Sequence, residues 1–234
     1  MNPPQPVVHV EPASAGVAVP VRLGVPLPRG WCVDPVRVGA RGTVDDAAVP
    51  MQGRALAHWS DGSVKWLLVD ALPPAAGGAM RLDPGIEPGQ AGAGARLGVD
   101  SDATRVAVAT GAATLDFGSG DDRLLNAVTL ADGTAQLGAR GVRLRATDAA
   151  GQARGVQVET VQVEEAGPVR AVVVARGTID GDGPLAFVAR WWIAAGARSA
   201  LLELRVRNSR AALHPGGLWD LGDPGSVLLG DLSV

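Results

Sequence analysis

The chain has 234 residues, of which 47% are hydrophobic and 19% are charged, a composition typical of a folded globular protein. A formal charge of −3 leaves no basic surface to neutralise phosphates, which argues against nucleic acid as a partner. No stretch approaches the roughly 18 consecutive apolar residues of a membrane span, so no membrane partner is expected.

Strand patterns dominate the first third of the chain. The segments "VVHVEPA" (7–13) and "VAVPVRLGVPLP" (17–28) are β-rich but cut by Pro, which marks strand edges and turns, and "SVKWLLVDALP" (63–73) is the clearest early strand. The following Gly, Pro and Ala-rich stretch leaves room for one short strand, at 79–82. This break in composition predicts a domain boundary between residues 92 and 93, which divides the chain into an N-terminal domain (1–92) and a C-terminal domain (93–234).

The second part of the chain predicts an antiparallel sandwich, because short strand patterns follow one another with Gly, Asp-Gly or Gly-Pro breaks between them. In "LLELRVRN", Leu202, Leu204 and Val206 share one face because side chains alternate along a strand. The opposite face carries Glu203, Arg205 and Arg207 and is therefore predicted to be solvent-exposed and positively charged.

The stretch "HWSDGSVKW" (58–66) holds two of the six Trp residues and the only Lys. Asp61 and Gly62 supply turn chemistry, so a tight turn into the next strand is expected. In one interpretation Trp59 and Trp66 are core rings around this hairpin. In the other, His58, Lys65 and an exposed Trp face bind a sugar, with the ring stacking and the Lys pairing with a carboxylate.

The first part of the chain contains the motifs "GVPLP" (24–28), "PMQ" (50–52) and "WSDGSVKW" (59–66). The second part contains "TGAATLDF" (110–117), "EEAGPVRAVVVARG" (164–177) and "WDLGDPGS" (219–226). The first set resembles the N-terminal barrel of the exo-rhamnogalacturonan lyase family of polysaccharide lyases, and the second set resembles the β-sandwich that follows this barrel. The resemblance implies an all-β chain with a small N-terminal β-barrel and a large antiparallel β-sandwich.

In that family a helical toroid supplies much of the catalytic cleft. No stretch of this sequence has the 3.6-residue periodicity of long helices, and the sequence stops within strand-like "GSVLLGDLSV" (225–234). We therefore expect a sandwich that is incomplete at its C-terminus, in the N-terminal part of a longer lyase-like protein whose partner is a C-terminal helical toroid domain.

β-Elimination at a uronate needs a base, an acid and a cationic group that neutralises the carboxylate. The chain contains no Tyr and only three histidines, so catalytic residues are not assigned. The loop-like stretch after the cationic strand is the best candidate for contact with an acidic polysaccharide, because Arg can bind a carboxylate and Trp can stack on a pyranose ring. The predicted substrate-binding residues are Arg205, Arg207, Asn208, His214, Trp219 and Asp220.

No cofactor or metal is predicted. Cys32 is the only cysteine, so neither an intrachain disulfide nor a Cys-based metal site can form. The segment "DGDGP" (180–184) lacks the terminal bidentate Glu of a calcium loop. The N-terminus shows neither a basic n-region nor an apolar h-region, so we expect no export signal and a cytoplasmic protein by default.

Two functions of different class remain open at this point. The chain can be the N-terminal region of a rhamnogalacturonan-lyase-like enzyme acting on pectic polysaccharide, contributing part of the cleft. Alternatively, it can be a stand-alone carbohydrate-binding or structural β module without activity.

Overall fold

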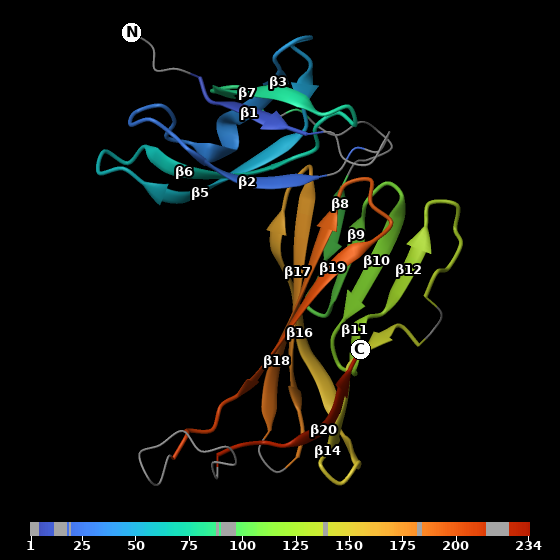
Figure 1. The fold of residues 1–234 in the computed structure, drawn as a ribbon. Coiled ribbons are helices and arrows are strands. Elements are labelled where there is room, and N and C mark those ends of the chain that lie inside the picture. The colour runs from blue at the N-terminus through green and yellow to red at the C-terminus, as the bar shows by residue number, and fades with distance from the viewer. Residues whose placement is uncertain are drawn as a thin grey trace. The chain divides into compact units, whose positions relative to one another are not determined.

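The computed structural model shows an all-β protein, which confirms the predicted fold class (Figure 1). Apart from the single-turn 3-10 helix η1 (Pro35–Arg37), the described residues form strands, turns and loops, and they include no helix long and apolar enough to span a membrane. The described residues are 5–11, 18, 20–87, 89, 97–137, 140–181, 184–213 and 225–234.

The chain divides into two compact units. The first comprises residues 1–98 together with 166–170 and 194–197, and the second comprises residues 99–165, 171–193 and 198–234. The predicted boundary between residues 92 and 93 lies outside the described residues.

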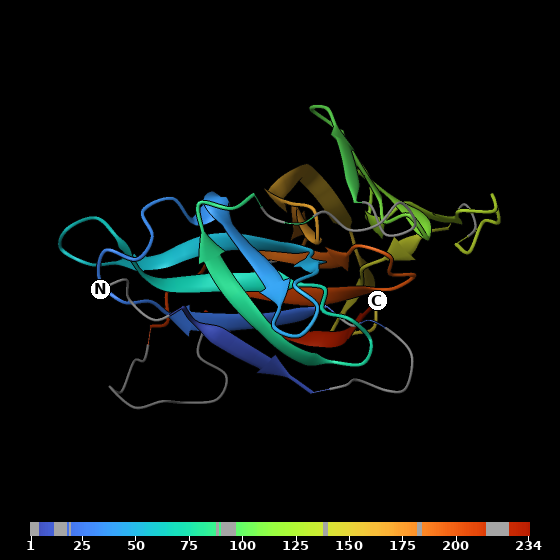
Figure 2. The same ribbon diagram turned by 90° about the horizontal axis from the view of Figure 1, so that it is seen from above.

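The first unit is built from two sheets whose strands cross when seen from above (Figure 2). One sheet has the order β1-β7-β3-β4 and the other β2-β6-β5, and all neighbouring strands in the two sheets are antiparallel. The strands are β1 (Val7–Val10), β2 (Val21–Pro26), β3 (Val38–Gly42), β4 (Ala48–Val49), β5 (Met51–His58), β6 (Val64–Ala71) and β7 (Gly78–Pro84). The short strand predicted at 79–82 is thus part of β7.

Residues from both sheets enclose the core of the first unit. Leu67 and Val69 of β6 point inward together with Leu82 of β7, and all three are fully buried. Cys32 is also buried, and this burial, reinforced by the nearby Asp34 carboxylate, raises the pKa of its thiol. The sole cysteine is therefore a small core residue held in the thiol form.

The second unit contains two four-stranded sheets, β12-β10-β9-β8 and β16-β17-β18-β19, and two smaller ones, β11-β13 and β15-β14-β20. Strands of the first four-stranded sheet are β8 (Gly98–Ser101), β9 (Arg105–Ala109), β10 (Ala113–Gly118) and β12 (Ala127–Leu130). The second is formed by β16 (Val156–Ala166), β17 (Arg170–Ile179), β18 (Leu185–Ala194) and β19 (Ala200–Asn208). The smaller sheets contain β11 (Arg123–Leu125), β13 (Val142–Arg143), β14 (Arg145–Asp148), β15 (Ala153–Arg154) and β20 (Leu229–Ser233).

Side chains from the two larger sheets meet in a common core, which makes this unit a β-sandwich. The rings of Phe117 in β10 and Trp191 in β18 lie 5.9 Å apart between centroids and are tilted by 58°. Both side chains are buried, as is Phe187 in β18. β18 alternates between buried and more exposed residues along its whole length, so one face of its sheet is core and the other faces outward.

Candidate functional site

The stretch 58–66 forms the predicted turn, between β5 and β6. Asp61 Oδ1 accepts hydrogen bonds from the backbone N–H and the hydroxyl of Ser63, at 3.0 and 2.6 Å, and Gly62 has a φ of 84°. These hydrogen bonds from Ser63, aided by the charge of Arg29, hold the pKa of Asp61 below its ordinary value. The turn is thus closed by the residues that the sequence pointed to.

The two Trp residues of this stretch have different environments. Trp59 is half-buried, donates from Nε1 to the Leu27 carbonyl at 3.1 Å, and has Lys65 Nζ 4.6 Å from its ring centroid. Trp66 is 42% exposed, so the interpretation as a core ring is wrong for this residue. Since Lys65 lies over Trp59, it is engaged within the turn rather than beside the exposed Trp66 ring.

Of the six predicted substrate-binding residues, the structure describes three, and all three lie in β19. Arg205 and Arg207 are exposed near the end of this strand, and Asn208 is its last residue. His214, Trp219 and Asp220 lie outside the described residues.

The pairing of β19 with β18 determines which side chains share a face. Leu202 pairs with Trp191 and Val206 with Phe187, so these residues belong to the core side, as the alternation predicted. They are only half-buried, because β19 ends the sheet and pairs only with β18 among the described strands.

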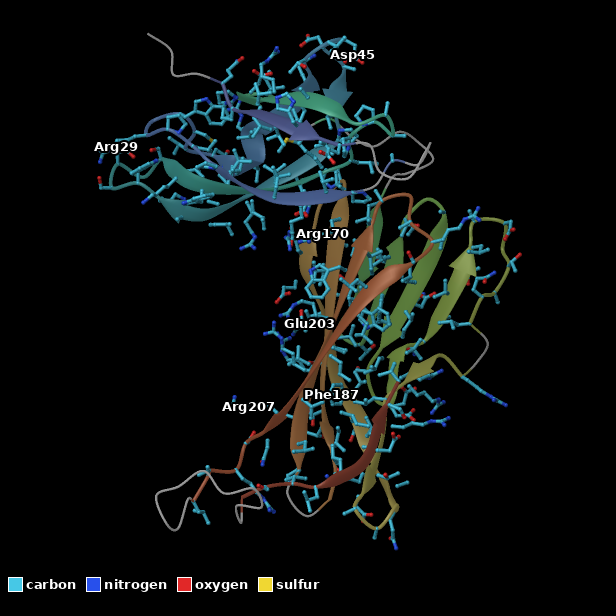
Figure 3. All side chains as sticks on the ribbon, in the orientation of Figure 1. Arg29, Asp45, Arg170, Phe187, Glu203 and Arg207 are labelled. Atoms are coloured by element: carbon cyan, nitrogen blue, oxygen red, sulfur yellow. The ribbon has the colours of Figure 1, made fainter. Side chains whose placement is uncertain are left out.

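On the outward side, β19 presents a row of residues opposite those of β18. Arg207 pairs with Ala186, Arg205 with Val188, Glu203 with Arg190, and Leu201 with Trp192. Glu203 and Arg207 are labelled along β19 in Figure 3.

Arg176 of β17 joins this outward side. A Cβ atom on the adjacent Gly177 would stand 2.6 Å from Cζ of Phe187, so Gly177 lies against the core ring. Because neighbouring side chains project from opposite faces of a strand, Arg176 points outward. We call the four outward residues the Arg face: Arg176, Arg190, Arg205 and Arg207.

The four guanidinium groups differ in their partners. Arg190 forms a bidentate pair with Glu164 at 2.6 and 2.9 Å, and these hydrogen bonds raise the pKa of the guanidinium further. Arg205 pairs with Glu203 on the same strand, and its side chain remains 70% exposed. Arg176 and Arg207 have neither an ion pair nor a side-chain hydrogen bond with the described residues.

Trp192 stands at one end of the Arg face and was missed by the sequence analysis. The doublet Trp191–Trp192 was a usable signal, because two neighbours on a strand cannot both enter the same core. Arg207 lies opposite Ala186, which is six residues from Trp192 along β18. At about 3.4 Å per residue, Trp192 and Arg207 are thus about 20 Å apart along the strand direction. The face thus combines a half-buried aromatic ring with a row of cations.

Asn208 is exposed, but its side-chain amide forms hydrogen bonds within the chain. Its Nδ2 donates to the Gly225 carbonyl at 2.7 Å, and its Oδ1 accepts from the Arg210 backbone N–H at 3.0 Å. Both ends of the amide therefore hold the chain after β19, and the predicted contact with substrate stays a prediction.

The Arg face can bind anions, and carboxylates in particular, because guanidinium donors match the two carboxylate oxygens. The two described histidines, His9 in β1 and His58 in β5, lie in the first unit. Within the described residues, no three His, Cys, Asp or Glu side chains group at metal-binding distance. The chemistry that the described face supports is recognition of a carboxylate-bearing ligand.

Comparison with known proteins finds a family similarity within the first unit. The model of the PcRGLX-like N-terminal RIFT barrel domain family matches residues 7–76, which include β1 to β6. No curated protein matches the chain. The match confirms the resemblance seen in "GVPLP" and "WSDGSVKW". Over residues 7–76 the chain is thus similar to the PcRGLX-like N-terminal RIFT barrel domain, which is consistent with the N-terminal domain of a rhamnogalacturonan lyase-like protein.

Proposed function

We propose that this chain is the substrate-binding N-terminal region of a rhamnogalacturonan-lyase-like protein, and that its Arg face binds the carboxylates of an acidic pectic polysaccharide. The observation that carries the proposal is the presence of exposed guanidinium groups without partners in the described chain, Arg176 and Arg207, on the same sheet face as Trp192. The family match of residues 7–76 supports the class of ligand.

The charges on this face suit a repeating acidic chain. Arg205 and Arg207 are two residues apart on one strand, which places their Cα atoms about 7 Å from each other. The exposed pair of Arg205 with Glu203 is weak enough in water to be exchanged for a ligand carboxylate. Trp192 adds an apolar surface on which the C–H side of a pyranose ring can stack.

β-Elimination becomes easier when the uronate carboxylate is neutralised, since charge builds up on it as the neighbouring proton leaves. In this proposal the Arg face contributes that neutralisation or holds the flanking sugars. The base and the acid come from a helical toroid domain, as the family resemblance implies. His214, Trp219 and Asp220 are proposed to extend the site from the loop after β19.

Calorimetric titration of the full chain with oligogalacturonides and rhamnogalacturonan I fragments tests the proposal. Replacing Arg207 by Gln should weaken binding by about tenfold, because a hydrogen bond to a charged group contributes about 1.5 kcal/mol or more. Arg105→Gln is the matched control, since this exposed Arg lies in β9 of the opposite sheet and pairs with Asp116. Equal affinities for the wild type and the Arg207 and Arg176 variants would contradict the proposal.

A structural module is the second candidate. The half-buried row Leu202, Leu204 and Val206 on the edge strand β19 favours it, because an additional strand or domain would complete their burial. Ultraviolet absorbance of unsaturated product separates the possibilities. Product from the chain alone shows a complete enzyme, and binding in the calorimetric titration without product supports the substrate-binding region. Neither product nor binding supports the structural module.

A further inference from the structure

The outward face of the sheet β2-β6-β5 in the first unit carries a second candidate site. Even-numbered residues of β5 project outward, and as far as Arg54 they lie opposite even-numbered residues of β6, before a bulge shifts the register so that Ala57 pairs with Trp66. Even-numbered residues of β2 lie opposite those of β6. Arg54 and Gly24 both lie beside Leu68, and Pro26 lies beside Trp66. The outward residues are Arg22, Gly24 and Pro26 of β2, Gln52, Arg54, Leu56 and His58 of β5, and Trp66, Leu68 and Asp70 of β6.

One end of this face is closed within the first unit by residues 166–170. Asp70 pairs with Arg22 at 3.1 Å and with Arg170 at 3.3 Å, and its side chain is only 6% exposed. Gln52 Oε1 accepts hydrogen bonds from the backbone N–H groups of Val169 and Arg170, at 3.1 and 2.9 Å. The polar groups at this end therefore have structural partners.

The other end of the face is open. Trp66 is 42% and Leu56 50% exposed, and both are large apolar side chains. The Trp66 ring is supported from the neighbouring strand, because its Cε3 and Cζ3 lie 3.7 and 3.8 Å from the position of a Cβ atom at Gly24. The ring is thus held at the surface.

Arg54 supplies a positive charge on the same sheet face, because it lies opposite Leu68, two residues from Trp66 along β6. It is exposed and has neither an ion pair nor a side-chain hydrogen bond with the described residues. By contrast, Arg22, Arg29, Arg41 and Arg81 of the same unit each pair with an Asp. A supported aromatic ring and an unpaired guanidinium on one sheet face are the two elements needed to bind a sugar ring that carries a carboxylate.

We propose that Trp66 and Arg54 form a separate binding site for one uronic acid residue of an acidic oligosaccharide. The sugar ring stacks on the exposed side of Trp66, and Arg54 binds its carboxylate. The choice of a uronic acid rests on the proposed function, whereas the site itself shares no residue with the Arg face. Lys65 takes no part, because its ammonium group lies over Trp59.

Nuclear magnetic resonance of the indole N–H groups tests this site in the full chain. The spectrum of ¹⁵N-labelled protein is followed during titration with trigalacturonate, and the Trp66 signal is identified by its loss in Trp66→Phe. We expect this signal to shift and to saturate, and Arg54→Gln to weaken the fitted affinity by about tenfold. Arg29→Gln is the matched control, since Arg29 is an exposed Arg of the same unit that pairs with Asp61, and it should leave the affinity unchanged.

The outcomes separate this site from the Arg face. A shift of Trp66 that persists in Arg207→Gln supports two sites. A shift of Trp192 without one of Trp66 overturns this inference and leaves the proposed function standing, whereas no shift of either signal overturns both. If a neutral trisaccharide shifts the Trp66 signal as much as trigalacturonate does, Arg54 does not bind a carboxylate and this part of the inference is overturned. A Trp66 signal that moves with protein concentration alone shows that a second copy covers the ring, and this also overturns the inference.

Discussion

Trp191 and Trp192 are neighbours in β18 but lie on opposite faces of its sheet. Trp191 is 6% exposed and packs against Phe117 of the facing sheet, whereas Trp192 lies on the outward side opposite Leu201. Trp191 Nε1 is buried and lacks a hydrogen-bond partner among the described residues. The two rings therefore contribute to different properties, one to stability and the other to the outward surface.

Replacing Trp191 by Ala should lower the free energy of unfolding by about 3–5 kcal/mol, because a large buried ring is lost and a cavity remains. Trp191→Phe should cost less, since it keeps an aromatic ring and removes a buried N–H group without a partner. Denaturant unfolding measures both. Trp192→Ala should cost less than Trp191→Ala and should instead weaken binding of acidic oligosaccharide, and a reversed order of stabilities would contradict the assigned faces.

Replacing Gly177 by Ala should destabilise the sandwich by about 1–3 kcal/mol, which is typical of overpacking. The added Cβ atom would collide with the carbonyl oxygen of Gln157 and stand 2.6 Å from the Phe187 ring. Gly24→Ala is the control, because its new Cβ atom would meet only Trp66, at an ordinary 3.7 Å. Thermal unfolding of the two variants should differ clearly, and equal midpoints would argue against the close approach of β17 and Phe187.

Asp70→Asn should lower the free energy of unfolding by about 3 kcal/mol, because it removes a buried charge that faces two guanidinium groups. Asp70 pairs with Arg22 and Arg170, and it is almost completely buried. Asp46→Asn removes an exposed partner of Arg41 and Arg81 and should cost less than about 1 kcal/mol. Denaturant unfolding compares the two variants, and similar losses would show that the Asp70 network is no stronger than a surface pair.

The turn around Asp61 predicts a dependence of stability on pH. Because its hydrogen bonds from Ser63 lower the pKa in the folded state, the ionised carboxylate stabilises the fold above its unfolded pKa of about 3.9. This contribution is lost as the pH falls through the folded pKa. Asp61→Asn should therefore unfold at a lower temperature than the wild type at pH 7. The difference should shrink below about pH 4, and a difference that is constant across this range would contradict the assignment.

Much of the fold could be predicted from local patterns. Gly62 and Asp61 identified the turn before β6 because their conformational preferences are local, and the alternation in β19 correctly assigned Leu202 to the core side. The exposure of Trp66 could not be predicted, because alternation gives two faces but does not say which of them another element covers.

The candidate site was only partly predictable for the same reason. Arg207 was found because it lies in an obvious run of alternating charges. Arg176 and Arg190 come from other strands, and their place beside it depends on how the strands pair across long separations in sequence. The contacts of Asn208 with the Gly225 carbonyl and the Arg210 amide depend on which residues the fold brings to the end of β19, and no pattern in the strand encodes this.

The most direct test of the Arg face is a calorimetric titration of the full chain with rhamnogalacturonan I fragments, and with a neutral galactan of similar length. We expect saturable binding of the acidic fragments that weakens as salt is added, because the guanidinium groups are exposed, and no binding of the neutral chain. Equal binding of both polysaccharides, or binding of neither, would contradict recognition of carboxylates by Arg176, Arg190, Arg205 and Arg207.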